Sequence, residues 1–191
     1  MNAEQITIEN LINNAAVIRS DRKSVSAQVK DGKLIIRAPK RMPAWEIRRF
    51  IASRAQDIMR LAMRDEAARA GAGEPLSDEE KTGLYRRARE FFPERAAYYA
   101  GLLGVSFGRI TIRLQKTRWG SCSAKKNLNF NAALMLAPEY VADSVAAHEV
   151  CHLIEMNHSE KFYRLLYGVF SEYDAARTWL KTNGPAILKK I

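Results

Sequence analysis

Hydrophobic and polar positions alternate in short runs through the first forty residues. The hydrophobic positions are rich in β-branched side chains, a pattern typical of β-strands. The runs predict strands at 5–12, 15–20, 24–29 and 33–39. Asp31-Gly32, between the last two runs, is a strong signal for a two-residue hairpin turn. This part of the chain is therefore expected to form a layer of strands.

The periodicity then changes from that of a strand to that of a helix. Apolar residues recur three and four positions apart from Ile47 to Ala62, which predicts one long amphipathic helix reaching about Ala70. Pro43 is expected in its first turn, where a proline costs no hydrogen bond. The segment AGAGEP at 70–75 is rich in glycine and alanine and is interpreted as a linker.

A second long helix is expected after this linker. Ser77 followed by Glu80 forms a capping box that predicts where the helix begins. Pro93 is expected to kink or divide it, and Gly104 to end it.

The rest of the chain mixes short strands with helices. Strands are predicted at 109–114 and 127–131, followed by three helical segments. These segments run from Pro138 to about Met156, over 159–170 and over 172–182, with Gly184 as a stop. The sequence thus predicts an α+β fold with a strand-rich region plus long helix at 1–70 and a second region at 76–191.

Composition narrows the class of protein. Of the 191 residues 47% are apolar, which is enough for a packed core. No apolar run reaches the roughly 18 residues of a membrane span, and the first ten residues do not resemble a signal peptide. The two cysteines do not form a disulfide scaffold. We therefore expect a cytoplasmic protein that does not enter a membrane.

The net charge of +10 favours anionic partners without choosing among them. Residues 1–96 carry 19 basic and 14 acidic side chains, and residues 97–191 carry 12 and 7, so each half has a net charge of +5. The sequence contains no basic stripe interleaved with aromatic residues, so specific binding of nucleic acid is not favoured.

The strongest chemical signal is a cluster of histidines. All three histidines of the chain lie in HEVCHLIEMNH, at 148–158. His148 and His152 are four residues apart on a predicted helix, so their imidazoles share one face and can bind one divalent cation. Glu149 follows the first histidine and can reach a water on that cation, as in the H-E-x-x-H arrangement of metalloproteases. The alternative is a chance match on a helix.

His158 is a candidate third ligand. The helix must end for it to fold back, and we expect a turn after about Met156, with Asn157 in a capping conformation. Ser159 can then cap the next helix. Three protein ligands leave a fourth coordination position open, as in catalytic zinc sites. Cys151 can be a further ligand, although a buried thiol is the favoured interpretation.

Two motifs together resemble a known family. RWGSCS at 118–123, the asparagine-containing strand after it, and HEVCHLIEMNHSEKF at 148–162 are similar to those of the YgjP-like metallopeptidases. These are small zincins related to the SprT and WLM proteases. The resemblance implies a zincin-like, minimal gluzincin-type metal helix against a small sheet, with an N-terminal strand layer and a long helix. It also implies that His148, His152 and His158 bind Zn²⁺ or another divalent transition metal, and that Glu149 is the general base.

Three further residues are candidates for substrate binding. Gly120 would let a substrate backbone approach closely. Arg118 can stabilise an oxyanion or bind a phosphate or carboxylate, or it can pair with an acidic residue of the protein. Tyr163, one turn beyond His158, can donate a hydrogen bond to an oxyanion or can pack in the core.

The favoured function is a metal-dependent hydrolase, and specifically a zinc metallopeptidase that uses a metal-activated water with Glu149 as base. One alternative is a metal-dependent nucleotide pyrophosphohydrolase. Arg113, Lys116 and Arg118 favour it, whereas the lack of a glycine-rich phosphate loop weakens it. A second alternative is a non-catalytic basic interaction module with a structural metal. The expected partner is accordingly a peptide or a nucleotide substrate.

Overall fold

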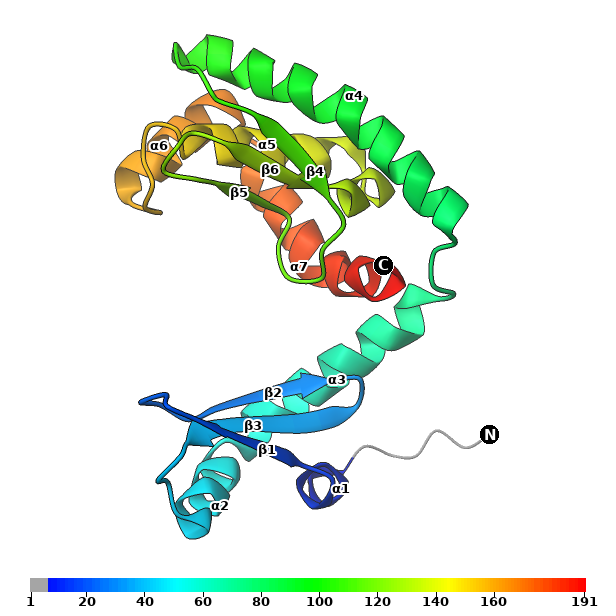
Figure 1. Cartoon of the computed structure of the whole chain (residues 1–191), viewed down its shortest axis with the longest axis vertical. Coiled ribbons are helices and arrows are strands. Elements are labelled where there is room, and N and C mark those ends of the chain that lie inside the picture. The colour runs from blue at the N-terminus through cyan, green and yellow to red at the C-terminus, as the bar shows by residue number, and fades with distance from the viewer. Residues whose placement is uncertain (1–6) are drawn as a thin grey trace. The chain divides into compact units, whose positions relative to one another are not determined.

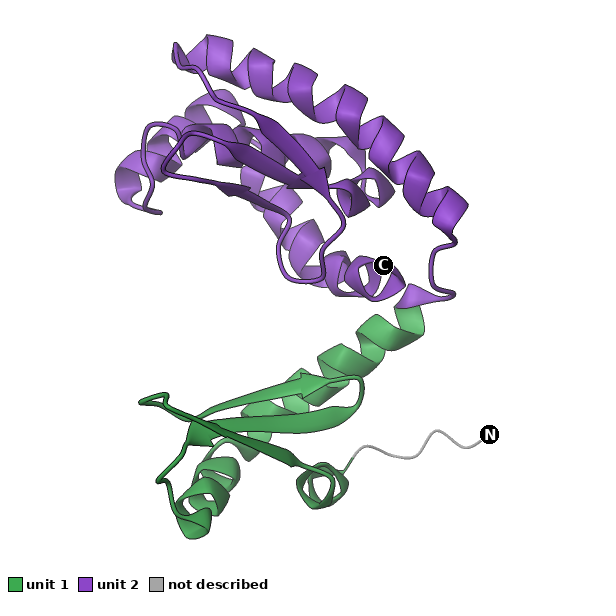
Figure 2. Cartoon of the chain, in the orientation of Figure 1, with its two compact units in different colours: residues 1–71 green, residues 72–191 purple. Residues whose placement is uncertain are grey.

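The computed structural model describes residues 7–191, which divide into two compact units at residues 1–71 and 72–191 (Figure 2). The described residues form seven α-helices and two three-stranded sheets. The predicted α+β class is therefore confirmed. Along this part of the chain, no helix is both long and apolar enough to span a bilayer.

The first unit contains one sheet and three helices (Figure 1). Its elements are α1 (Ile8–Asn13), β1 (Ala16–Ser20), β2 (Ser26–Lys30), β3 (Lys33–Pro39), α2 (Ala44–Ser53) and α3 (Ala55–Ala72), of which the last residue belongs to the second unit. The strand order is β1-β3-β2, with β1 parallel and β2 antiparallel to β3. The predicted hairpin turn is confirmed, because Asp31 and Gly32 both have positive φ angles between the paired Lys30 and Lys33.

The core of this unit is apolar. Alternate residues of β3 are buried, as expected when one face of a strand covers a core. The buried residues are Leu34, Ile36 and Ala38 of β3, with Leu11 of α1, Ile47 and Ile51 of α2, and Ile58 and Ala62 of α3.

Two predictions for this unit are wrong. The strand expected at 5–12 is a helix from Ile8 to Asn13, because the Thr7 side chain caps it by accepting a hydrogen bond from Asn10 N at 3.2 Å; residues 5 and 6 lie outside the described residues. The single helix expected from Pro43 to about Ala70 is two helices that meet at Arg54. Arg54 leaves the helical conformation, with φ −117° and ψ 16°.

The second unit is built around a helix that touches most of its other elements. It contains α4 (Asp78–Leu103), β4 (Ile110–Arg113), β5 (Gly120–Cys122), β6 (Leu128–Asn131), a 3₁₀ helix η1 (Ala132–Leu136), α5 (Glu139–Cys151), α6 (Glu160–Val169) and α7 (Tyr173–Lys190). The strand order is β4-β6-β5, with β4 parallel and β5 antiparallel to β6. Helix α5 contacts α4, α6, α7, β5 and β6 (Figure 1).

The second core lies between α4, α5 and this sheet. Phe92 of α4 stacks on Phe130 of β6, with ring centroids 4.4 Å apart. The predicted capping box of Ser77 and Glu80 is confirmed, as is the end of α4 at Gly104, which adopts a left-handed conformation.

Two predicted helix boundaries are wrong. Pro93 does not divide α4, which continues through it, and the proline lies on an exposed face where water can bind the freed backbone carbonyl. Helix α5 ends at Cys151 instead of about Met156. Helix α7 continues through Gly184 to Lys190. Gly184 packs against Trp119, and an added Cβ would lie 2.8 Å from Cζ2 of the indole, so close packing accounts for the glycine.

Candidate metal centre

The end of α5 carries the first three candidate residues. His148 and Glu149 lie in its last turn and His152 caps it, so the three side chains leave one short stretch of backbone. Glu149 and His152 are only 6% and 8% exposed, and His148 is half-buried. Small residues such as Ala146 and Ala147 precede them, which lets neighbouring elements approach α5 closely.

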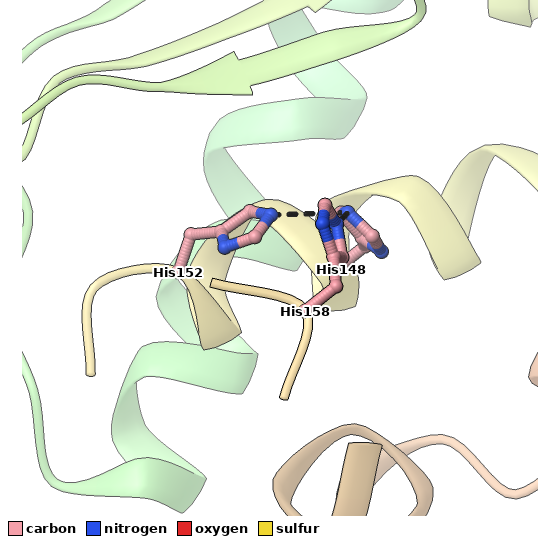
Figure 3. Close-up of side chains that lie close together, drawn as sticks. All are labelled: His148, His152 and His158. Atoms are coloured by element: carbon pink, nitrogen blue, oxygen red, sulfur yellow. Dashed lines mark hydrogen bonds between the residues drawn. The ribbon is translucent and has the colours of Figure 1, made fainter. Parts of the chain in front are cut away.

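The loop after α5 brings the third histidine back to the other two. The backbone turns between His152 and Ser159, where Ser159 caps α6. The Nε2 atoms of His152 and His158 each lie 3.1 Å from Nε2 of His148 (Figure 3). One ring nitrogen from each histidine lies within 4.8 Å of the others. The structure therefore gathers all three predicted ligands at one point.

Hydrogen bonds orient two of the imidazoles. His152 Nδ1 lies 3.0 Å from the carbonyl oxygen of Glu155, which can only accept, so Nδ1 carries the proton and Nε2 keeps its lone pair. His148 Nδ1 lies 3.2 Å from the hydroxyl of Tyr173 on α7, and the two rings stack. Tyr173 was not identified from the sequence, because it is 25 residues away on another helix.

A single phenyl ring underlies the cluster. The ring centroid of Phe162 lies 4.9 Å from that of His148, 4.5 Å from that of His152 and 4.9 Å from that of His158. Phe162 is fully buried in α6. It therefore restricts all three imidazoles from the protein side and leaves their Nε2 atoms facing one another.

Burial keeps the two helix-borne histidines neutral. It lowers the pKa of His148 to about 3, with smaller contributions from the nearby ionisable side chains of His152, His158 and Arg177. Burial also lowers the pKa of His152. Neutral imidazoles have the lone pairs that a metal requires.

Glu149 is buried beside this cluster without a compensating partner. Burial raises the pKa of its carboxyl to about 8, and the positive charge of Arg118 partly opposes that shift. Its Oε2 atom is buried and has no hydrogen-bond partner within residues 7–191. An unpartnered carboxylate oxygen beside three convergent imidazole nitrogens fits a divalent cation with nitrogen ligands and one open position.

A pocket of about 300 Å³ opens beside His148 and Glu149. Its wall combines apolar side chains with one arginine from α7. The other lining residues are Trp119, Gly120, Ser144, Val145, Tyr173, Arg177 and Leu180. Arg177 is a further residue that the sequence pattern did not identify, because nothing local connects it to the histidines.

The model of the YgjP-like metallopeptidase domain matches residues 74–183, more than half of the chain. The chain belongs to the YgjP-like metallopeptidase family. The crystal structure of the metallopeptidase zymogen abylysin of Pyrococcus abyssi is 21% identical and covers 48% of this chain and 94% of its own, with a TM-score of 0.43. A likeness this distant carries no conclusion about the site. No curated protein is significantly similar to this chain.

The structure gives a reason for the glycine at position 120 of this YgjP-like domain that is separate from the predicted approach of a substrate backbone. A Cβ at this position would lie 2.5 Å from Oε1 and 2.7 Å from Cγ of Glu149. The missing side chain therefore makes room for the carboxylate of Glu149. Gly120 positions the candidate base, whatever it allows a substrate to do.

The other two candidates are not among the residues that line the pocket of the YgjP-like domain. The Arg118 side chain is exposed, and its backbone carbonyl accepts a hydrogen bond from Asn131 Nδ2 at 3.0 Å. Tyr163 packs against Phe162, and its ring centroid lies 6.4 Å from that of His158. The core packing considered for Tyr163 is what the structure shows.

The two cysteines remain outside the histidine cluster. Cys151 is fully buried, and this burial raises the pKa of its thiol to about 12. The expectation of a buried thiol is confirmed for Cys151. Cys122 is half-buried on β5, and its pKa is raised by burial and by the nearby charge of Glu149.

Proposed function

We propose that this protein is a zinc metallopeptidase of zincin type. His148, His152 and His158 would hold Zn²⁺ or another divalent transition metal, and Glu149 would be the general base. The convergence of three Nε2 atoms beside a buried, unpartnered carboxylate is the observation that carries this proposal. The match of the metallopeptidase family over residues 74–183 supports it.

A bound divalent cation would supply Lewis-acid chemistry, by polarising the scissile carbonyl and acidifying the attacking water. Glu149 would take the proton of that water on its carboxylate and deliver it to the leaving amine nitrogen. Without a cation, burial holds the pKa of this carboxyl at about 8. Positive charge beside the carboxyl opposes the effect of burial, so Glu149 is better able to ionise in the metal-loaded protein.

The edge of the second sheet supports a peptide substrate. Strand β5 is at the end of the order β4-β6-β5, so one of its edges pairs with no other strand in the described chain. Its first residue, Gly120, lies against Glu149. An extended peptide that pairs with this edge would run past the general base. A nucleotide would instead need several phosphate ligands near the cluster; Arg118 does not line the pocket, and Arg177 is the one basic side chain among its lining residues.

Hydrolysis by the metal-loaded protein tests the proposal. We expect one equivalent of metal per chain, cleavage of denatured casein or of a peptide library, and loss of cleavage on chelation. Nucleoside triphosphates should be tested in parallel with the same preparation. Hydrolysis of a triphosphate without any peptide cleavage would overturn the peptidase proposal in favour of a pyrophosphohydrolase.

Glu149→Gln is the matched inactive variant. It keeps the size of the side chain and can still accept hydrogen bonds, but it cannot accept the proton. We expect unchanged metal content and a fall in turnover of about 10²- to 10⁴-fold, the usual contribution of a general base. Full activity in this variant would show that Glu149 is not the base, and loss of metal would assign it a ligand or structural role.

A further inference from the structure

One face of α7 forms a wall of the pocket next to the histidines. Tyr173, Arg177 and Leu180 all line the pocket and lie four and three residues apart, so they share a helix face. Gly184 continues that face by a further four residues and contacts Trp119, another pocket residue. Helix α7 thus orients His148 through the Tyr173 hydroxyl, places the guanidinium of Arg177 in the pocket wall and supports the indole of Trp119.

Arg177 is the one charged side chain that α7 contributes to the lining of this pocket. Its side chain is exposed, and no hydrogen bond or ion pair joins it to another residue in the described part of the chain. Arg177 nevertheless lies at the site, because it lines the same pocket as His148 and is one helical turn from Tyr173, whose hydroxyl lies 3.2 Å from His148 Nδ1. A guanidinium that lines a pocket without a carboxylate partner is available to a ligand.

The rest of the pocket is mainly apolar. Trp119, Val145 and Leu180 line it, and the hydroxyl of Ser144 donates to the carbonyl of Val141 at 2.7 Å. Glu149 is the pocket's acidic residue and is already assigned to the reaction. A volume of about 300 Å³ is at the small end of ligand sites. The pocket therefore suits a short apolar stem that ends in an anion.

We propose that this pocket is a substrate subsite for a carboxylate on a short aliphatic stem, and that Arg177 determines this specificity. The inference rests on the proposed peptidase function and names its substrate class. On a peptide the carboxylate would come from an acidic side chain or from the C-terminus. The planar guanidinium can bind either one through two parallel hydrogen bonds.

Matched peptides separate these two sources. A quenched fluorogenic peptide would carry Glu, Gln or Lys in turn at each position around the cleaved bond, made both as the free acid and as the C-terminal amide. We expect kcat/KM for the best Glu peptide, or for the free acid, to exceed that of its neutral partner by about 10- to 100-fold, the range for a charge-assisted hydrogen bond. The position of the effect identifies which carboxylate is bound.

Variants of Arg177 test its role. Arg177→Ala should bring the charged-to-neutral ratio close to one, and Arg177→Glu should shift preference to the Lys peptide. Arg164→Glu on α6 is the matched control, because it makes the same change in net charge at an exposed arginine outside the pocket. The inference is overturned if the ratio is unchanged in Arg177→Ala, or if Arg164→Glu alters it equally.

A binding measurement keeps this inference separate from the proposed function. Metal-loaded Glu149→Gln would be titrated with the same peptides, with and without Arg177→Ala, and the dissociation constants compared. Peptide cleavage with equal affinity for Glu and Gln peptides would remove the subsite but keep the peptidase. Selective binding of the Glu peptide or the free acid, without any cleavage by the parent protein, would remove the peptidase but keep the anion subsite.

Discussion

The two units of this chain bury different kinds of side chain. Every buried residue of the first unit, within residues 7–71, is hydrophobic. All four buried polar residues of the described chain lie in the second unit: Asn131, Ser144, Glu149 and His152. Burying a polar group is unfavourable unless hydrogen bonds replace those lost to water. Among the described residues, the first unit therefore buries no polar residue, although Nε of the half-buried Arg22 has no hydrogen-bond partner, whereas the second unit accepts polar residues in its core.

The hydrogen-bond partners of these four residues show which of them is compensated for its burial and which is not. Asn131 binds the backbone carbonyls of Gln115 and Arg118, Ser144 binds its own helix, and His152 binds the Glu155 carbonyl. Only Glu149 keeps a buried oxygen without a partner. Asn131 and Ser144 therefore support local structure, His152 is oriented as part of the histidine cluster, and the uncompensated Glu149 lies beside that cluster. The comparison predicts that site chemistry and core packing respond to different substitutions.

The largest expected effect is on metal binding. His158→Ala removes an exposed side chain from a loop, so the fold should survive while the metal affinity falls by far more than the roughly 100-fold typical of changes beyond the ligands. Ile36→Ala in the first unit should cost about 2–5 kcal/mol of stability and leave the metal stoichiometry unchanged. Elemental analysis, chelator competition and thermal denaturation measure both. Unchanged metal content in His158→Ala would contradict its role as a ligand.

Sequence reasoning located the histidine cluster because its spacing is local. Two ligands four residues apart on a helix, with Ser159 capping the next helix, leave little freedom in where His158 can lie. The helix ended earlier than expected, at Cys151, yet the three histidines still meet. Tyr173 and Arg177 could not be found in this way, because packing of α7 against α5 brings them to the site.

The difference between local patterns and contacts across the chain also explains why some predicted helices and strands are wrong. Thr7 and Leu11 fit a capped helix as well as the predicted strand, and local pattern does not separate a short helix from a short strand. Gly184 was interpreted as a helix stop because glycine favours that position. Its actual constraint is the indole of Trp119, 65 residues earlier in the chain. Contacts between distant segments decide these boundaries.

The next effect concerns the space around Glu149. Gly120→Ala would place a Cβ 2.5 Å from Oε1, so the carboxylate must move. A displacement of about 1 Å at a reacting group can cost roughly 10²-fold in rate, and we expect a loss of that size with unchanged metal content. Gly101→Ala is the control, because no atom lies within 4 Å of its added Cβ. Equal activity of both variants would contradict a positioning role for Gly120.

A smaller effect is expected at the hydroxyl of Tyr173. Tyr173→Phe keeps the ring that stacks on His148 but removes the oxygen 3.2 Å from its Nδ1. Loss of such an orienting hydrogen bond typically weakens metal affinity by about 10- to 100-fold. Tyr167→Phe removes a comparable hydroxyl that binds Asp174 outside the cluster, and it should leave the metal affinity unchanged. Similar affinities in both variants, measured by chelator competition, would show that the Tyr173 hydroxyl does not orient His148.

The smallest effect, taken per unit of pH, is the change in stability with pH, which should be measured on the metal-free protein. Burial raises the pKa of Glu149 from 4.5 to about 8, so between these values the folded state holds a proton that the unfolded state has lost. Stability from this residue therefore falls as the pH rises from about 4.5 to about 8. His148 acts in the opposite direction, because its pKa falls from 6.5 to about 3 and its unfolded form binds the extra proton between those values. Stability from His148 therefore rises with pH up to about 6.5.

These two contributions oppose each other between pH 4.5 and 6.5, and only Glu149 acts between 6.5 and about 8. Above pH 6.5 the metal-free protein should lose up to roughly 1 kcal/mol of unfolding free energy per pH unit from this residue. Glu149→Gln removes this loss, so its stability advantage over the parent should be small near pH 4.5 and grow up to about pH 8. Urea denaturation at successive pH values measures the difference. A constant difference across that range would show that burial does not hold the proton on Glu149, and that the carboxyl is already ionised before any metal binds.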